Sequence, residues 1–155
     1  MHARTARHRA FSLIELVVVV VILGVIAAIA IPRMSRGAAG AGDSGVASDL
    51  AILRNAIELY RAEHDGDYPP VATFEAALTQ FSDRAGNTQA TPDTTHIYGP
   101  YITAIPALKV GAKRGATGVA NADAAGIGWI YDDASGDIRA NATESDDAGV
   151  AYNTY

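Results

Sequence analysis

The feature that most constrains this chain is an apolar segment near its N-terminus, residues 11–31. Apart from Gly24, its only members that are not apolar are Ser12 and Glu15. As a helix rising about 1.5 Å per residue, it would extend about 30 Å, the thickness of a bilayer's hydrocarbon core. Valine and isoleucine dominate it, but a single segment in lipid satisfies its backbone polar groups only as a helix. The segment therefore predicts a membrane-spanning helix.

Charged residues on either side of the segment predict its orientation. Arg4, Arg7 and Arg9 precede it, and the first charge after it is Arg33. An excess of basic residues holds the cytoplasmic end, so we expect a cytoplasmic N-terminus and an exported C-terminal part. A cleaved secretory signal is the alternative, because Ala28-Ile29-Ala30 resembles a small-x-small cleavage site. The apolar stretch of such signals is only about 7–15 residues long, so we favour a retained helix.

Glu15 is the one charge inside the apolar segment. A carboxylate costs about 2.5–3.5 kcal/mol at the centre of a membrane helix, and less toward an interface. One interpretation is that Glu15 extends to the lipid headgroups. The other is that it has a partner that offsets the cost of its burial.

The residues around Glu15 resemble a known processing signal. A short basic leader, residues 1–10, precedes Phe11-Ser12-Leu13-Ile14-Glu15-Leu16, which is similar to the signal of type IV pilins and type II secretion pseudopilins. The resemblance implies that a prepilin peptidase cuts between Ala10 and Phe11 and methylates the new amino group of Phe11. The family usually has glycine before the cut, where this chain has Ala10. Glu15 would then neutralise the N-terminal amine of a neighbouring subunit where water is excluded.

A break in the helix is predicted where the apolar segment ends. Pro32 lacks a backbone N–H and clashes with the preceding turn, and it falls where the pilin family has its helix-interrupting proline. Each glycine in a helix costs about 1 kcal/mol relative to alanine. The sequence predicts a flexible joint over residues 32–45, with an ordinary linker as the alternative, before an exported domain of residues 46–155. The glycines are Gly37, Gly40, Gly42 and Gly45.

Periodicity predicts two helices in the exported part. Apolar residues spaced by three and four positions indicate an amphipathic helix from about Ser44 to Glu63, and the same spacing indicates a short helix over residues 74–81. The first stripe consists of Val46, Leu50, Leu53, Ile57 and Tyr60; the second consists of Phe74, Ala77, Leu78 and Phe81.

Two strands and their turn are also predicted. Residues 128–131 and 137–140 are typical strands, and the polar loop between them suits a hairpin. We expect loops over residues 82–96 and 111–127. The sequence thus predicts an α+β protein with the pilin fold. In that fold a long N-terminal helix, with a membrane half and an amphipathic half, packs on a small antiparallel sheet.

Further segments resemble the major, G-type pseudopilin of type II secretion. They are Glu58-Leu59-Tyr60-Arg61, Asp67-Tyr68-Pro69-Pro70, Gly99-Pro100-Tyr101-Ile102 and Ile105-Pro106. The resemblance implies a structural subunit of a secretion pseudopilus. Such a subunit waits in the inner membrane as a single-pass protein and assembles into a homo-oligomeric filament. Its implied partners are the prepilin peptidase, an inner-membrane assembly platform and a secretion ATPase. Two alternatives stay open: a type IV pilus pilin for adhesion or motility, and a single-pass membrane-anchored domain that binds a ligand.

Other chemistries find little support in the sequence. The formal net charge is −5, and it becomes −8 without the leader arginines, so we expect no nucleic-acid partner. No zinc, phosphate-loop or serine-hydrolase motif occurs, so we expect no enzyme, and we expect the histidines to be solvent-exposed. Cysteine is absent. The pseudopilin family often binds calcium in a C-terminal acidic loop. The candidate calcium ligands here are Asp132, Asp133 and Asp137, although they lack the spacing of an EF-hand loop.

Overall fold

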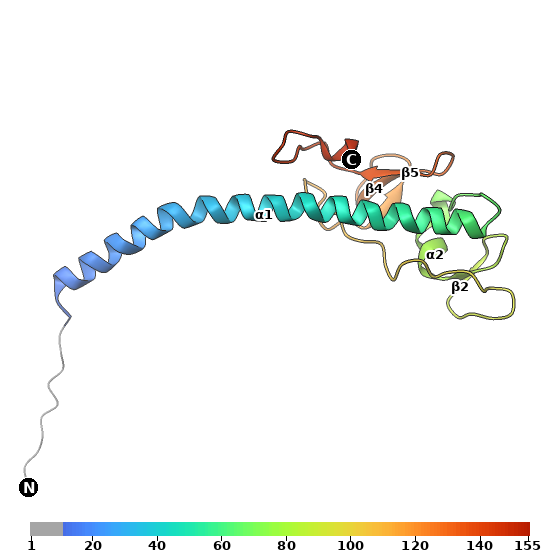
Figure 1. Cartoon of the computed structure of the whole chain (residues 1–155), viewed down its shortest axis with the longest axis horizontal. Helices are drawn as coiled ribbons and strands as arrows, with labels where there is room; N and C mark the ends of the chain where they lie inside the picture. Colours follow the sequence, from blue (N-terminus) through green and yellow to red (C-terminus); the bar gives the residue numbers. More distant parts are fainter. Residues whose placement is uncertain (1–10) are drawn as a thin grey trace, which may run out of the picture. The chain divides into compact units, whose positions relative to one another are not determined.

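The computed structural model describes residues 11–155, which form two compact units divided between Ala38 and Ala39. Helix α1 is assigned from Leu13 to Glu63, so its first part belongs to one unit and its second part to the other. In the first unit, the apolar stretch Leu13–Ala30 packs against no other part of its unit. Its length and composition suit a membrane span, as the sequence predicts. Figure 1 shows where each element falls along the chain.

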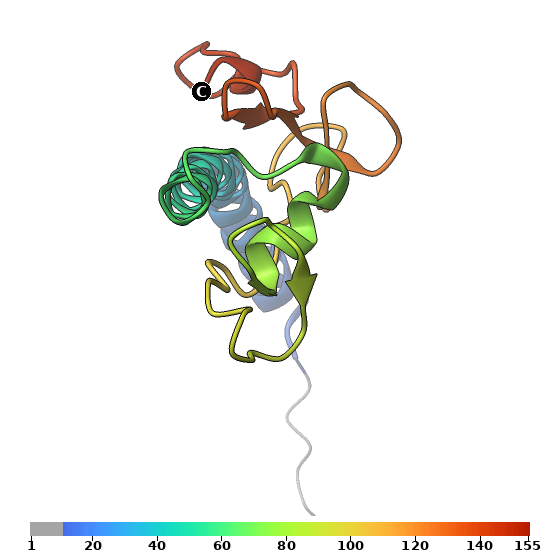
Figure 2. The ribbon, with the colours of Figure 1, turned by 90° about the vertical axis from the view of Figure 1, so that its right-hand side faces the viewer.

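The second unit, Ala39–Tyr155, confirms the predicted α+β fold class, with small sheets beside the second part of α1. One sheet pairs β1 with β2, and the other has the strand order β3-β4-β5. Figure 2 shows α2 and the β4–β5 hairpin beside this part of α1. After α1, the elements are η1 (Val71–Thr73), α2 (Phe74–Thr79), β1 (Phe81–Ser82), β2 (Thr88–Gln89), β3 (Gly118–Ala120), β4 (Ile127–Asp132), β5 (Asp137–Ala140) and η2 (Tyr152–Thr154).

The strands correct three sequence predictions. The larger sheet is mixed, because β3 runs parallel to β4 while β4 and β5 are antiparallel. Strand β3 lies inside residues 111–127, and β2 lies inside residues 82–96, both of which we expected to be loops. Both strands are too short to show an alternating pattern, so it is pairing with a neighbour that makes them strands. The predicted β4–β5 hairpin is confirmed: Trp129 lies opposite Ala140 and Tyr131 opposite Ile138.

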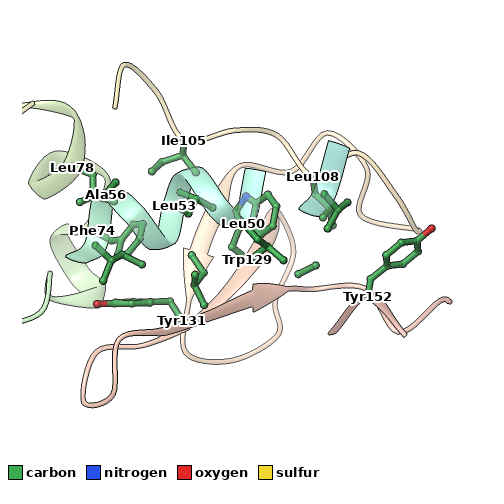
Figure 3. Close-up of a cluster of buried hydrophobic side chains, with 14 of the residues drawn as sticks. Leu50, Leu53, Ala56, Phe74, Leu78, Ile105, Leu108, Trp129, Tyr131 and Tyr152 are labelled. Atoms are coloured by element: carbon green, nitrogen blue, oxygen red, sulfur yellow. The ribbon is translucent and has the colours of Figure 1, made fainter. Parts of the chain in front are cut away.

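The core gathers on the predicted apolar stripe of α1, all five members of which are buried. Residues from α2 and β4 cover this stripe, and Figure 3 shows Leu50 and Leu53 of the helix facing Trp129. The Trp129 indole N–H donates to the Pro106 carbonyl at 2.8 Å, which satisfies the one polar atom of a fully buried ring. Trp129 and Tyr131 are both fully buried core residues.

Two glycines of α1 let a loop approach the helix backbone. A methyl group at Gly45 would lie 2.6 Å from Cδ of Lys109, and one at Gly42 would lie 3.1 Å from Val110. The Lys109 side chain crosses the helix at Gly45 and places its ammonium 2.8 Å from the buried carboxylate of Asp49. These glycines are therefore packing positions. The flexibility of residues 32–45 stays a prediction.

The C-terminal end of α1 overturns the prediction of an exposed histidine. His64 is only 2% exposed, and its ring stacks on Tyr60 with centroids 3.7 Å apart. Its Nδ1 lies 2.7 Å from the Tyr60 carbonyl, which only accepts, so Nδ1 carries the proton. Nε2 lies 3.0 Å from the Ser82 hydroxyl, so His64 ties the helix to β1. His64 is buried because it follows Tyr60 by four positions on the core face.

Candidate processing and assembly site

The N-terminal end of α1 begins two residues after Phe11. The Ser12 hydroxyl accepts a hydrogen bond from the Ile14 N–H at 3.3 Å, and the Glu15 carboxylate accepts one from the Ser12 N–H at 3.0 Å. The first helical backbone bond runs from the Leu16 N–H to the Ser12 carbonyl at 3.2 Å. Ser12 is thus the N-cap and Glu15 the third helical residue. The Glu15 contact is that of a capping box, while the Ser12 hydroxyl caps the N–H of the second helical residue.

The capping box gives Glu15 a role that sequence reasoning missed. Its carboxylate satisfies a backbone donor that the helix itself leaves free, and it lies at the positive end of the helix dipole. The Ser-x-x-Glu spacing is a recognised helix-start pattern and could have revealed this contact. Both side chains are exposed in the single subunit. Glu15 therefore has a local partner before any assembly takes place.

Phe11 lies next to this cap and outside the helix. It is 80% exposed, and the side chains of Leu13 and Ile14 are exposed with it. Ala10, on the other side of the predicted cleavage point, lies outside the described residues. Pro32 falls within the assigned bounds of α1. The predicted roles of these residues in processing, methylation and helix breaking stay predictions.

The candidate calcium ligands lie around the β4–β5 hairpin, and the carboxylates of Asp132 and Asp133 have protein partners, whereas that of Asp137 accepts no hydrogen bond from the described residues. Asp132 accepts from the Ala134 N–H and the Ser135 hydroxyl, which shape the turn. Asp133 accepts from the Val71 N–H at 3.2 Å and so links the hairpin to η1. Among the described residues, no three acidic or histidine side chains are grouped closely enough to hold a metal ion. The observed contacts give the two aspartates a structural role, and calcium binding stays a prediction.

A buried tyrosine lies near the same hairpin. Burial, and then the negative charge of Asp133, raises the pKa of the Tyr131 hydroxyl well above its usual range, so this group is neutral at physiological pH. Its ring packs against Phe74 with centroids 4.5 Å apart. The Tyr131 hydroxyl has no hydrogen-bonding partner among the described residues. We assign it to the core, because nothing around it forms a reactive group.

Comparison with known proteins identifies the N-terminal signal. The family described as the prokaryotic N-terminal methylation motif matches residues 5–31, which include the capping box and the apolar stretch. This motif supports a type IV pilin-like precursor that is processed by prepilin peptidase. The proteins that carry the motif are structural subunits. With the apolar helix, it indicates membrane anchoring near the N-terminus. No curated protein and no solved structure matched the chain.

Proposed function

We propose that this protein is a structural subunit of a type II secretion pseudopilus. Prepilin peptidase would cut between Ala10 and Phe11, and the apolar helix would pass from the inner membrane into the core of a helical filament. The observation that carries the proposal is the methylation motif at residues 5–31 joined to an apolar helix that packs on nothing in its own unit. Because all of its side chains lack cover within the unit, this helix needs either lipid or other subunits around it.

The same geometry supports a change of partner for Glu15 during assembly. In the single subunit its carboxylate accepts from the Ser12 N–H. Removal of the leader would create a cationic amine at Phe11, and a neighbour's amine would bind the carboxylate more strongly than a neutral amide does. In a filament core that excludes water, this pairing would offset the cost of burying the acid.

Our support for the secretion branch over a pilus is the resemblance of segments in the second unit to the G-type pseudopilin. Three of the four segments that resemble the G-type pseudopilin meet in the structure. The Tyr60 and Tyr101 rings meet edge to face at 5.9 Å, and the Arg61 guanidinium lies 4.9 Å from the Tyr68 ring centroid. Gly99 suits this cluster, because a methyl group there would lie 2.8 Å from the Gln80 carbonyl oxygen. The segment 58–61 at the end of α1 therefore contacts two of the other segments, 67–70 and 99–102.

The first experiment tests processing. The full chain would be expressed with its own prepilin peptidase, and the mass and N-terminal sequence of the membrane-extracted product measured. A product that starts at N-methylated Phe11 supports the proposal. A retained leader, or a cut after Ala30, refutes it and leaves a membrane-anchored or secreted ligand-binding domain.

A second experiment separates pseudopilus from pilus. Deleting the gene in its native host should block the export of secreted proteins while adhesion and motility persist. Lost adhesion or motility with normal secretion would instead establish a type IV pilus pilin.

A further inference from the structure

Arg139 differs from every other cation in the unit Ala39–Tyr155. The unit has seven basic and sixteen acidic side chains, a formal charge of −9. Six of the basic residues donate to a carboxylate or a carbonyl of their own chain: Arg54, Arg61, Arg84, Lys109, Lys113 and Arg114. Within the part of the chain that the structure describes, Arg139 forms no hydrogen bond and no ion pair. It is therefore the one cation that this acidic domain does not use internally.

The surroundings of Arg139 are shaped to receive a polar group. It projects from the outer face of β5, opposite Ile130 of β4, and both residues line two adjoining hollows of about 560 and 220 Å³. Asn121 and Asn153 line the same two hollows, and their side-chain amides make no hydrogen bonds with described residues. An arginine fork and two free amides are the donors that a carboxylate accepts from.

The charge near Arg139 limits what can bind. Asp132, Asp137 and Arg54 also line the larger hollow, and Arg54 already donates to the Ile138 and Tyr155 carbonyls. Asp137 lies two residues from Arg139 on the same strand face, about 7 Å away. These two acids, in a domain of charge −9, disfavour a phosphate or nucleic-acid ligand that carries several negative charges. A single carboxylate places the smallest negative charge beside them while still accepting from both arms of the Arg139 fork.

We propose that Arg139 binds a carboxylate of a second copy of this chain. The inference rests on the proposed filament function, because a filament brings domains of charge −9 side by side. Their repulsion favours contacts that pair opposite charges. Arg139 is the cation available for such a pair, and its amide neighbours can orient the incoming group. The contact would set how neighbouring exported domains pack, in addition to the packing of the apolar helices.

The symmetry of a filament narrows the choice of carboxylate. A helical filament uses head-to-tail contacts, in which one surface of a subunit meets a different surface of the next. In the described part of Ala39–Tyr155, four carboxylates accept no hydrogen bond and form no ion pair. Asp137 is excluded, since it belongs to the Arg139 surface itself. The remaining candidates lie elsewhere on the domain: Asp67, Glu75 and Asp147.

The test uses the full chain, produced with its peptidase and filament-assembly machinery. Arg139→Gln removes the charge from an exposed side chain that makes no hydrogen bond or ion pair with the described residues, so the subunit should be processed and accumulate normally. Its yield of sheared filaments should fall at least about threefold, and Arg139→Lys should restore part of it. The control is Arg84→Gln, which removes the same charge from an arginine paired with Asp65 and should leave the yield unchanged. Subunit mass and cellular level are measured for every variant.

Charge exchange identifies the partner. Arg139→Glu should abolish filaments, and one of Asp67→Arg, Glu75→Arg or Asp147→Arg in the same chain should restore them. Normal filament yield from Arg139→Gln overturns the proposal. If Arg139→Glu abolishes filaments and none of the three exchanges restores them, the assignment to a second copy is overturned, because the carboxylate then comes from another molecule. If the unaltered chain forms no filaments, the proposed function is refuted. If the unaltered chain forms filaments and Arg139→Gln gives the same yield, only the Arg139 contact is refuted.

Discussion

Alanine substitution of Gly40, Gly42 and Gly45 should change the free energy of unfolding in different directions, although all three glycines lie in helix α1. At Gly40 a methyl group meets nothing within 4 Å. Gly40→Ala should therefore gain the full helix-propensity difference of about 1 kcal/mol. At Gly45 a methyl group would lie 2.6 Å from Lys109 Cδ and would displace the stem that carries the ammonium to Asp49. Gly42 is intermediate, at 3.1 Å from Val110.

The cost at Gly45 is estimated from the Lys109–Asp49 pair. Half of the Lys109 side chain is exposed, so solvent screens the pair and its own contribution is about 1 kcal/mol or less. Losing it also leaves a carboxylate that is 5% exposed without its partner, which costs about 1–3 kcal/mol more. After the gain in propensity, Gly45→Ala should destabilise the domain by about 1 kcal/mol. The Gly40 and Gly45 variants should then differ by about 2 kcal/mol, or about 8 °C in Tm.

The assay is thermal and urea unfolding of the fragment 32–155, followed by circular dichroism. Lys109→Ala supplies the control, because with the lysine stem removed Gly45→Ala should become stabilising by about 1 kcal/mol, as at Gly40. If Gly45→Ala stabilises the unaltered fragment as much as Gly40→Ala does, the close approach of Lys109 to the helix is refuted.

Three further results are expected. Removing residues 1–31 should give a soluble, monomeric, cooperatively folding fragment by size-exclusion chromatography and calorimetry; an aggregated product would place the domain boundary elsewhere. Glu15→Ala should still be extracted with the membrane fraction but should form no filaments in electron micrographs, and normal filaments from this variant alone would exclude charge matching. A hydrogen bond from the Tyr155 hydroxyl, followed by the Val150 N–H, lowers the pKa of Asp146. Its ionised form therefore stabilises the folded state above the ordinary carboxyl range, and this contribution is lost as pH falls through the lowered pKa. Asp146→Asn should thus flatten the loss of stability below about pH 4 in urea titrations, and an unchanged acid profile would contradict this role.

Predictions from sequence succeeded where one residue pattern dictates the outcome. The apolar stripe of the amphipathic helix is buried at all five positions, and the β4–β5 hairpin pairs as its alternating pattern requires. They failed where polar or small residues carry the packing. His64 looked like an exposed histidine in a polar segment, but stacking on Tyr60 and contact with Ser82 make it part of the interior. Nothing in its immediate neighbours showed the strand that would cover it.

The candidate site divides in the same way. Local sequence was enough to locate the processing signal, because an enzyme reads such a signal along the chain, and the methylation motif matches residues 5–31. The contact of Glu15 with the Ser12 N–H was missed, although these residues are only three apart. The hydrogen-bonding partner of the Asp133 carboxylate could not be found in this way, since it is the Val71 backbone N–H of η1, 62 positions away. The sequence also could not show that Arg139 lacks a hydrogen bond and an ion pair among the described residues, because the partners of the basic residues are seen only in the structure.

By itself, the sequence determined that this protein has an apolar N-terminal helix with a pilin-like processing signal, followed by a small α+β domain. The processing signal comes from the resemblance of residues 11–16 to a known motif. The helix and the domain follow from hydrophobic length and 3.6-residue periodicity, which involve near neighbours. Only the tertiary structure decided that β3 pairs parallel to β4, that Gly42 and Gly45 admit a loop against the helix, and that Arg139 has no hydrogen bond or ion pair with any described residue. These outcomes depend on how segments that are distant in the sequence pack against one another, which near neighbours in the sequence do not determine.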